Sequence, residues 1–315
     1  MSRCYGIIGT GAIGGYYGAC LQQAGFPVHF LLRSDYEWVK AKGLRIESVN
    51  GDFTLPRVNA YNDPAQMPAC DVVLVALKTT QNETLPQILP SLVGEGSTVV
   101  LLQNGLGIEE EVAKIPGVKR VLGGLCFICS NKIGAGHIRH LDYGQVTLGE
   151  YAQNNEPCGI TMVMQEIEQD FKRAGIETQL SEDLHLSRWQ KLVWNIPYNG
   201  LSVVLDATTE EIMANENSRV LVRQLMEEVA IGAKTRDRAI TPDFIEKMLD
   251  YTSKMKPYKT SMKLDYDSHR SLEIEAIFGN PLKIAQAANT DLPRIRMLYQ
   301  QLQFLEVMNC SQCNF

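Results

Sequence analysis

The sequence predicts an α/β protein in which a doubly wound parallel sheet is followed by a mainly α-helical domain. In the first half of the chain, short apolar runs alternate with helical stretches, which is typical of βαβ units. From about Asp183 onward, apolar residues recur at spacings of three and four, which is the spacing of amphipathic helices. These two patterns indicate two domains of different class.

The strands of the first domain follow from apolar runs. The run RCYGIIG predicts the first strand, and the small and apolar residues after it predict a helix that ends at Gly25. Four further strands are predicted in the segments PVHFLLR, DVVLVALK, STVVLLQNG and RVLGGLCFIC. Helical stretches lie between several of these strands.

The second half carries four helical segments: DLHLSRWQKLVWNIPYNGLSVVL, SRVLVRQLMEEVAIGAKTR, TPDFIEKMLDYTSKM and IEAIFGNPLKIAQAAN. We therefore expect the first domain to span residues 1–182 and the helical domain to span residues 183–306. Residues 307–315 are expected to form a tail.

Composition and charge limit the class of protein. The 315 residues are 45% hydrophobic and 21% charged, as in ordinary globular proteins. A net charge of −6 argues against nucleic acid as the main partner, because phosphate binding relies on clustered Lys and Arg. We found no long apolar run and no signal-peptide pattern, so we expect no membrane association and a cytoplasmic location. The expected partner is a small molecule, and a homodimer is considered.

A G-x-G-x-x-G pattern stands between the first predicted strand and its helix. Gly9 permits a tight turn, Gly11 lets the backbone approach a pyrophosphate, and Gly14 lets helix and strand pack closely. The helix N-terminus, which includes Ala12 and Ile13, presents free N–H groups to an anion. With a strand before it and a helix after it, the motif predicts a Rossmann-type dinucleotide site, although a purely structural turn has the same pattern.

The end of the second strand indicates which dinucleotide binds. NAD sites commonly place an acid there for the ribose hydroxyls, whereas NADP sites need a cation for the 2′-phosphate. Arg33 occupies this position, and its guanidinium can bind a phosphate with two hydrogen bonds. The sequence therefore favours NADPH. An exposed, solvated Arg33 is the alternative, and Asp35 leaves NAD open.

Polar side chains follow two more of the predicted strands. Lys78 and Gln81 belong to LKTTQ after one strand, and Asn104 belongs to QNGLG after the next. Because ligands bind outside the carboxyl ends of strands in open α/β sheets, we expect these residues near the dinucleotide.

A polar stripe marks the first helix of the second domain. Lys191, Asn195 and Asn199 are spaced by four, so they share one face if the helix continues. Pro197 and Gly200 threaten its second turn and could place Asn199 at a kink or cap. From spacing alone, a solvated helix face fits as well as a binding face.

Six stretches together resemble the ketopantoate reductase family, also called 2-dehydropantoate 2-reductases. They are G-x-G-x-x-G, LKTTQ, QNGLG, WQKLVWNIPYNGLS, DATTEE and SMKLDYDSHRSLEIE, and the resemblance covers residues 3 to about 300. It implies a Rossmann domain that binds NADPH and a helical domain that closes over the substrate. The chain departs from many family members at Gly200, where they have proline, and in the loop ATTEEI.

The resemblance also implies roles for individual residues. The family's catalytic lysine falls on Lys191 and its catalytic glutamate on Glu273. Its substrate-contacting positions fall on Asn195, Asn199 and Ser261, and its cleft residues on Lys78 and Asn104. We expect Asn104 to contact the substrate as well as the cofactor. An ammonium suits the reaction, because reduction of a 2-keto acid places negative charge on the carbonyl oxygen. Glu273 would orient the lysine or relay protons. The alternative is a surface carboxylate on a charged helix, and Glu275, two residues on, shows how easily the register could mislead.

Two other functions remain open from the sequence. One is the reduction of a different 2-keto or 3-keto acid, because 3-hydroxyacid dehydrogenases also combine a Rossmann domain with a helical domain that supplies lysine and asparagine. The other is a catalytically silent NADPH sensor. We expect such a sensor to lack the lysine or the glutamate, and both are present here.

No metal site is expected. Cys126-x-x-Cys129 and Cys310-x-x-Cys313 could supply four thiolates, but they are far apart in the chain. His137 and His140 are interpreted as loop or strand-surface residues. The eight cysteines are expected to be reduced thiols.

Overall fold

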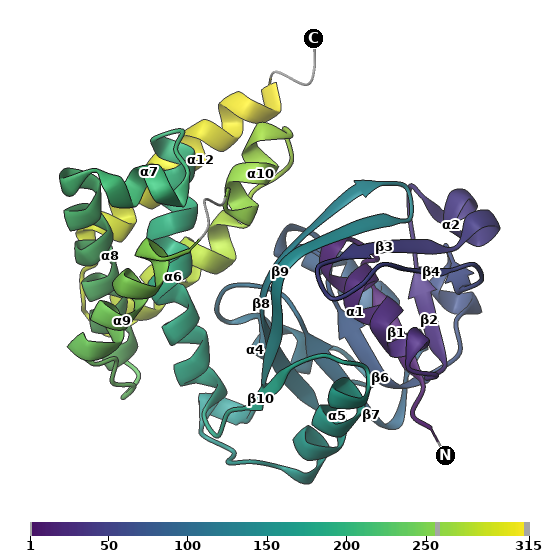
Figure 1. Ribbon diagram of the computed structural model, residues 1–315. Coiled ribbons are helices and arrows are strands. Elements are labelled where there is room, and N and C mark those ends of the chain that lie inside the picture. The colour runs from purple at the N-terminus through teal and green to yellow at the C-terminus, as the bar shows by residue number, and fades with distance from the viewer. Residues whose placement is uncertain (1, 256–258, 312–315) are drawn as a thin grey trace. The chain divides into compact units, whose positions relative to one another are not determined.

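The computed structural model describes residues 2–255 and 259–311, the last two of these without their side chains. The chain divides into two compact units (Figure 1). The first comprises Met1–Gln103 and Ile108–Leu184, and the second comprises Asn104–Gly107 and His185–Phe315. The loop Asn104–Gly107 thus groups with the second unit, which corrects the continuous first domain expected over residues 1–182.

Six parallel strands form the centre of the first unit. Their order in the sheet is β5 (Asn59–Tyr61), β2 (Val28–Leu31), β1 (Tyr5–Ile8), β6 (Cys70–Val75), β7 (Val93–Leu101) and β8 (Val121–Gly134). Counted along the chain, this is the Rossmann strand order, whose direction reverses between β1 and β6. The predicted fold class of this unit is confirmed.

Four more strands extend the sheet beyond β8. They are β9 (His137–Glu150), β3 (Leu44–Ser48), β4 (Phe53–Leu55) and β10 (Thr178–Leu180). Strand β9 runs antiparallel to β8 in a long hairpin, and β4 runs antiparallel to β3, so the sheet is mixed rather than wholly parallel. The sequence pattern revealed only the apolar first part of this hairpin, because the rest is half-exposed and polar.

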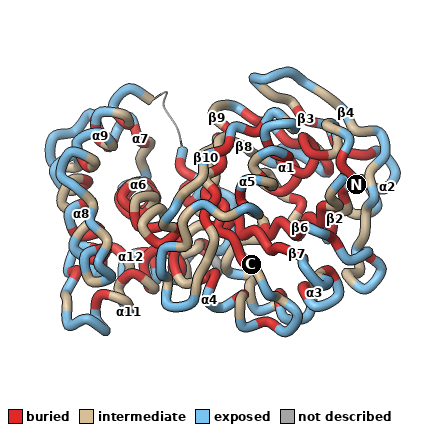
Figure 2. Tube along the Cα trace, turned by 90° about the horizontal axis from the view of Figure 1, so that it is seen from below, coloured by how far each residue is buried: buried red, intermediate tan, exposed pale blue. Residues whose placement is uncertain are grey.

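Helices pack on the sheet of the first unit. They are α1 (Ala12–Gln23), α2 (Tyr36–Lys42), α3 (Leu85–Leu92), α4 (Ile108–Ala113) and α5 (Met162–Arg173), with short 3₁₀ helices η1 (Pro64–Gln66), η2 (Thr79–Thr84) and η3 (Gln153–Asn155). The core lies between sheet and helices and includes Tyr17, Phe30, Leu74 and Phe171, all with no exposed surface. The buried strands are red in Figure 2.

The second unit is helical. Its elements are α6 (Leu184–Val204), α7 (Thr209–Ala214), α8 (Glu216–Lys234), α9 (Pro242–Ser253), α10 (Ser261–Asp267), the π-helix η4 (Glu275–Gly279), α11 (Asn280–Ala287) and α12 (Pro293–Ser311). Helix α6 is largely buried (Figure 2) and contributes Trp189, Val193, Ile196 and Tyr198 to the core. The predicted helical class of this part is confirmed.

Two local expectations for the second unit need correction. Helix α6 runs through Pro197 and Gly200 without a break, because its neighbours Ile196 and Tyr198 are held in the core. Helix α12 continues to Ser311, so residues 307–311 are not a tail. Asn309 ties this end of α12 to the backbone carbonyl of Tyr266 and to the ring of His269. Residues 312–315 lie outside the described residues.

Within the part of the chain that the structure describes, no helix is long and apolar enough to cross a membrane.

Candidate active site

The three motif glycines lie at the carboxyl end of β1, and each has the environment that its expected role requires. Gly9 has a positive φ of 91°, and a Cβ there would stand 2.7 Å from the backbone nitrogen of Leu77. A Cβ on Gly14 would stand 2.4 Å from the carbonyl oxygen of Gly9. A Cβ on Gly11 would meet nothing within 4 Å, so open space lies in front of this residue.

Helix α1 begins in this open space. Gly11 is its N-cap residue, no acidic side chain lies in its first turn, and Ala12 and Ile13 are its first two residues. Their unpaired N–H groups and the positive end of the helix dipole favour an anion there. The cradle therefore fits the pyrophosphate of a dinucleotide.

Arg33 and Gln81, which are distant in sequence, come together beside this loop. The Arg33 Nη1 donates a hydrogen bond of 3.1 Å to Gln81 Oε1, and Arg33 is exposed. The hydroxyl of Thr10 in the glycine loop bonds to the carbonyl oxygen of Leu31 at the end of β2. Hydrogen bonds thus link three segments of the first unit: the glycine loop to the end of β2, and Arg33 after β2 to Gln81 in η2.

Asp35 has a different function from the one that would favour NAD. Its carboxylate is 2.6 Å from Lys132 Nζ and accepts a hydrogen bond of 3.1 Å from the backbone N–H of Gly136. The residue is only 8% exposed. This carboxylate is already engaged by the β8–β9 hairpin, whereas Arg33 is exposed, which favours Arg33 and a 2′-phosphate.

Lys78 follows β6, on the other side of the point where the strand order reverses. It is half-buried and is the N-cap residue of η2. The amide of Gln103 holds the loop around it, donating to the carbonyl oxygen of Leu77 at 2.8 Å and to Asn82 Oδ1 at 2.6 Å. In open α/β sheets this crevice is where ligands bind.

The polar stripe of the second unit lies on an uninterrupted helix. Lys191, Asn195 and Asn199 fall within an arc of about 80° on α6. Asn195 is 6% exposed and Asn199 is 2% exposed, whereas Lys191 is half-buried. The interpretation as a solvated face is therefore wrong. The Oδ1 of Asn199 is buried without a hydrogen-bond partner among the described residues, which is costly unless a ligand supplies a donor.

Asn104 begins the loop that packs against the π-helix η4. The N–H of Leu106 donates a hydrogen bond of 2.9 Å to the carbonyl oxygen of Ala276. Asn280 Nδ2 donates one of 2.7 Å to the carbonyl oxygen of Leu106. Gly105 is required here, because its φ is 105° and a Cβ would stand 2.4 Å from Ala276. The structure thus brings the half-buried Asn104 to the segment that follows Glu273.

The structure distinguishes Glu273 from Glu275. Glu275 is exposed and bonds to the hydroxyl of Tyr299 and to Lys283 Nζ, the latter at 3.1 Å. Burial tends to raise the pKa of Glu275, but these two partners lower it below its usual value. Glu273 is half-buried and lies two residues before the start of the π-helix η4, a feature that is frequent at functional sites. Glu275 is the surface carboxylate of the two.

Ser261 is the first residue of α10 and is exposed. Its neighbour Thr260 is the N-cap, and its hydroxyl accepts a hydrogen bond of 3.2 Å from the backbone N–H of Lys263. The sequence analysis did not single out Thr260 or Lys263, because neither residue belongs to a motif that indicates catalysis or binding.

The remaining candidates do not form a metal site. Among residues 2–255 and 259–311, no group of three or more His, Cys, Asp or Glu side chains is arranged to hold a metal ion. Cys313 and the side chain of Cys310 lie outside the described residues. His140 is not a surface residue, since it is 1% exposed and bonds to Ser48 and to the carbonyl oxygen of Tyr143.

A Rossmann-ordered unit with a glycine cradle and a helical unit with a Lys–Asn–Asn stripe, in which both asparagines are buried, define a dinucleotide-dependent oxidoreductase. The family model described as "Ketopantoate reductase PanE/ApbA" matches residues 5–153, and its C-terminal counterpart matches residues 183–306. The chain belongs to the ketopantoate reductase family.

Known proteins resemble the whole chain. It is 62% identical to a 2-dehydropantoate 2-reductase of Nostoc sp., over 98% of this chain and 96% of that one. The crystal structure of a 2-dehydropantoate 2-reductase from Geobacter metallireducens has a TM-score of 0.91 and 42% identity, covering 95% of this chain and 98% of that one. A D-mandelate dehydrogenase, described in a ternary structure with NADH and anilino(oxo)acetate, has a TM-score of 0.86. At 20% identity over 97% and 99% of the two chains, it shows the fold alone.

Proposed function

We propose that this chain catalyses the NADPH-dependent reduction of 2-dehydropantoate to pantoate, a step toward pantothenate and coenzyme A. The 62% identity to a named 2-dehydropantoate 2-reductase over nearly the full chain carries this proposal. The intact Lys191 and Glu273 support an active enzyme rather than a silent sensor.

The first unit, residues 1–182 without the Asn104 loop, is proposed to hold NADPH. Its glycine loop with Ala12 and Ile13 binds the pyrophosphate, and Arg33 with Gln81 binds the 2′-phosphate. Lys78 contributes at the end of β6, and Asn104, whose loop groups with the second unit, contributes after β7. When bound, NADPH supplies the hydride that reduces the ketone.

The second unit, residues 183–306, is proposed to bind and protonate the substrate. Lys191 stabilises the negative charge that develops on the carbonyl oxygen and donates the proton to it. Glu273 orients Lys191 or relays the proton to it. Asn195, Asn199 and Ser261 bind the carboxylate and hydroxyl groups of the substrate, and the unpartnered Oδ1 of Asn199 supports a contact with a substrate donor.

Steady-state oxidation of NADPH against a panel of keto acids tests the substrate. The panel contains 2-dehydropantoate, straight-chain and aromatic 2-keto acids, and 3-keto acids. We expect the highest kcat/KM with 2-dehydropantoate. Fast oxidation with another keto acid and none with 2-dehydropantoate would favour the alternative, the reduction of a different 2-keto or 3-keto acid.

We also propose a homodimer in the cytoplasm. The outer face of α12 exposes Met297, Phe304 and Met308 by 51%, 65% and 48%, an apolar stripe of a kind found at interfaces. The six cysteines whose side chains are described are free thiols, which suits a reducing compartment. Light scattering coupled to gel filtration of the wild type and of Phe304→Ser tests the dimer.

A further inference from the structure

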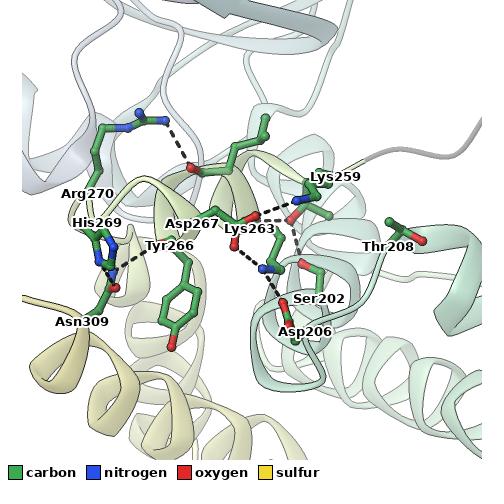
Figure 3. Close-up of polar contacts among 12 residues, drawn as sticks. Ser202, Asp206, Thr208, Lys259, Lys263, Tyr266, Asp267, His269, Arg270 and Asn309 are labelled. Carbon is green, nitrogen blue, oxygen red and sulfur yellow. Dashed lines mark hydrogen bonds and ion pairs between the residues drawn. The ribbon is translucent and has the colours of Figure 1, made fainter. Parts of the chain in front are cut away.

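A buried lysine outside the proposed catalytic set crosslinks α10 to the end of α6 (Figure 3). Lys263 is 4% exposed, and its Nζ stands 2.6 Å from Asp206 Oδ1 and also pairs with Asp267. The ring of Tyr266 lies below the same ammonium, 5.6 Å away. Burial tends to lower the pKa of Lys263, but its carboxylate partners raise it above the usual value, so the side chain is charged.

A chain of hydroxyls joins the same two helices a little deeper. Thr260 and Ser202 have no exposed surface, and their hydroxyl oxygens are 2.8 Å apart. Ser202 Oγ donates a hydrogen bond of 3.1 Å to the carbonyl oxygen of Asn199. Because this uses the single hydroxyl hydrogen of Ser202, Thr260 is the donor in the bond between the two hydroxyls. Thr260 Oγ1 in turn accepts from the backbone N–H of Lys263. The path runs from Asn199 on α6 to the first turn of α10.

Asp206 keeps an unfavourable backbone conformation at the end of α6. The N–H of Ala207 donates to the carbonyl oxygen of Ser202, and the N–H of Asp206 donates to the carbonyl oxygen of Val203. These two bonds form the Schellman motif that ends many helices. Asp206 occupies the left-handed position with φ 51°, where glycine is usual. Its side chain is 85% exposed yet turns to Lys263, so the ion pair accounts for an aspartate at this position.

We propose that Lys263 is a positioning residue for substrate binding: with Asp206 and Asp267 it holds Ser261 at a fixed place relative to Asn199. Ser261 stands two residues before Lys263 on the short helix α10, and the hydroxyl path ends at Asn199. The inference rests on the proposed function, because it takes these two residues as substrate contacts. It assigns Lys263 no contact with the substrate.

A purely structural crosslink is the competing explanation. Such a crosslink would lower the melting temperature when broken, and the molecules that remain folded would bind the substrate normally. A positioning residue predicts a different result, because a displacement of a contact by about 1 Å weakens binding or turnover strongly. The substrate KM, compared with the NADPH KM and with kcat, separates the two explanations.

The experiment compares three variants with the wild type. Lys263→Met removes the buried charge and keeps an unbranched side chain. Asp206→Asn removes one partner at the exposed end and tolerates the left-handed backbone, so it folds even if the buried change does not. Lys254→Met is the matched control, because Lys254 pairs with Asp250 at the same spacing of four but is 72% exposed.

For Lys263→Met and Asp206→Asn we expect the KM for 2-dehydropantoate to rise about 10-fold, with kcat and the KM for NADPH within about 2-fold of wild type. Calorimetric binding of pantoate to the NADP⁺ complex should weaken by the same factor, while NADP⁺ binding should not change. Lys254→Met should match the wild type. Unchanged substrate KM and pantoate affinity in both variants would overturn the proposal, whatever happens to the melting temperature. Absence of 2-dehydropantoate turnover in the wild type would instead overturn the proposed function.

Discussion

At the scale of single residues, the proposed reaction depends on a lysine held on a long, largely buried helix. Lys191 stands one and two turns before Asn195 and Asn199, and α6 carries all three without a kink. A protonated amine near a ketone oxygen both stabilises the developing charge and supplies the proton. Its removal should therefore affect turnover far more than cofactor binding.

Lys191→Ala is expected to lower kcat by at least about 100-fold, which is the usual contribution of a positioned general acid. NADPH affinity, measured by fluorescence titration, should stay within about 2-fold of wild type, because all the proposed cofactor groups except Asn104 lie in the other unit. Lys234→Ala, at the exposed end of α8, is the control. Unchanged turnover in Lys191→Ala would exclude it as the acid.

Arg33→Ala tests the assignment of the cofactor. Loss of charge-assisted hydrogen bonds to the 2′-phosphate should weaken NADPH about 10- to 100-fold, while NADH binding changes little. Isothermal titration with both nucleotides measures this, and Arg57→Ala is the control at another exposed arginine. Equal losses for NADPH and NADH would contradict a 2′-phosphate contact.

The sequence predicted the candidate residues one by one but not their partners. Arg33 and Gln81 were each expected near the cofactor, and only the fold shows that they bond to each other. Asp35 left NAD open in the sequence, because nothing local reveals that Lys132 on the distant hairpin holds its carboxylate. Long-range pairs of this kind do not follow from spacing.

At the scale of elements, the glycine loop shows how three identical residues carry different constraints. Gly9 and Gly14 are required by the protein itself, since side chains there would overlap backbone atoms. Gly11 faces open space, so the protein alone does not require it. If the loop holds a pyrophosphate, the ligand is the reason for Gly11.

Gly11→Ala and Gly14→Ala should therefore differ. Gly11→Ala is expected to change the free energy of unfolding by less than about 0.5 kcal/mol, yet weaken NADPH binding. Gly14→Ala should destabilise by about 1–3 kcal/mol through overpacking. Urea denaturation and NADPH titration of both variants measure the contrast. Full NADPH affinity in a well-folded Gly11→Ala protein would contradict the cradle.

Asp267, the last residue of α10, should make the stability of the protein depend on pH. Burial tends to raise the pKa of Asp267, but hydrogen bonds from Lys263 and Lys259 lower it below the usual value. A carboxylate whose pKa is lower in the folded state contributes stability above its unfolded pKa, about 3.9, and loses it as the pH falls through the folded pKa. We expect Asp267→Asn to be less stable than wild type at pH 6, with the difference in urea midpoint shrinking toward pH 3. A constant difference would show that the charge is not responsible.

Element boundaries were the weaker part of the sequence prediction. Proline and glycine suggested a break in α6, but burial of the surrounding side chains outweighs that local preference. The π-helix after Glu273 has no sequence signature, and the second strand of the long hairpin lacks a continuous apolar run.

At the scale of the whole molecule, each unit carries one part of the proposed site. The first has the strand order and the loop of a dinucleotide-binding fold, and the second has the polar stripe with its two buried asparagines. This division was predictable, because alternating and purely helical patterns separate cleanly near residue 183. The transfer of Asn104–Gly107 to the second unit was not predictable, because it depends on packing against Ala276.

The most direct test of the central claim follows the hydride into the product. NADPH carrying deuterium at both C4 positions is incubated with the protein and 2-dehydropantoate, and the product is analysed by mass spectrometry and NMR. The account predicts pantoate with one deuterium at C2 for each NADPH oxidised. Oxidation of NADPH without deuterium at C2, or no pantoate at all, would contradict it.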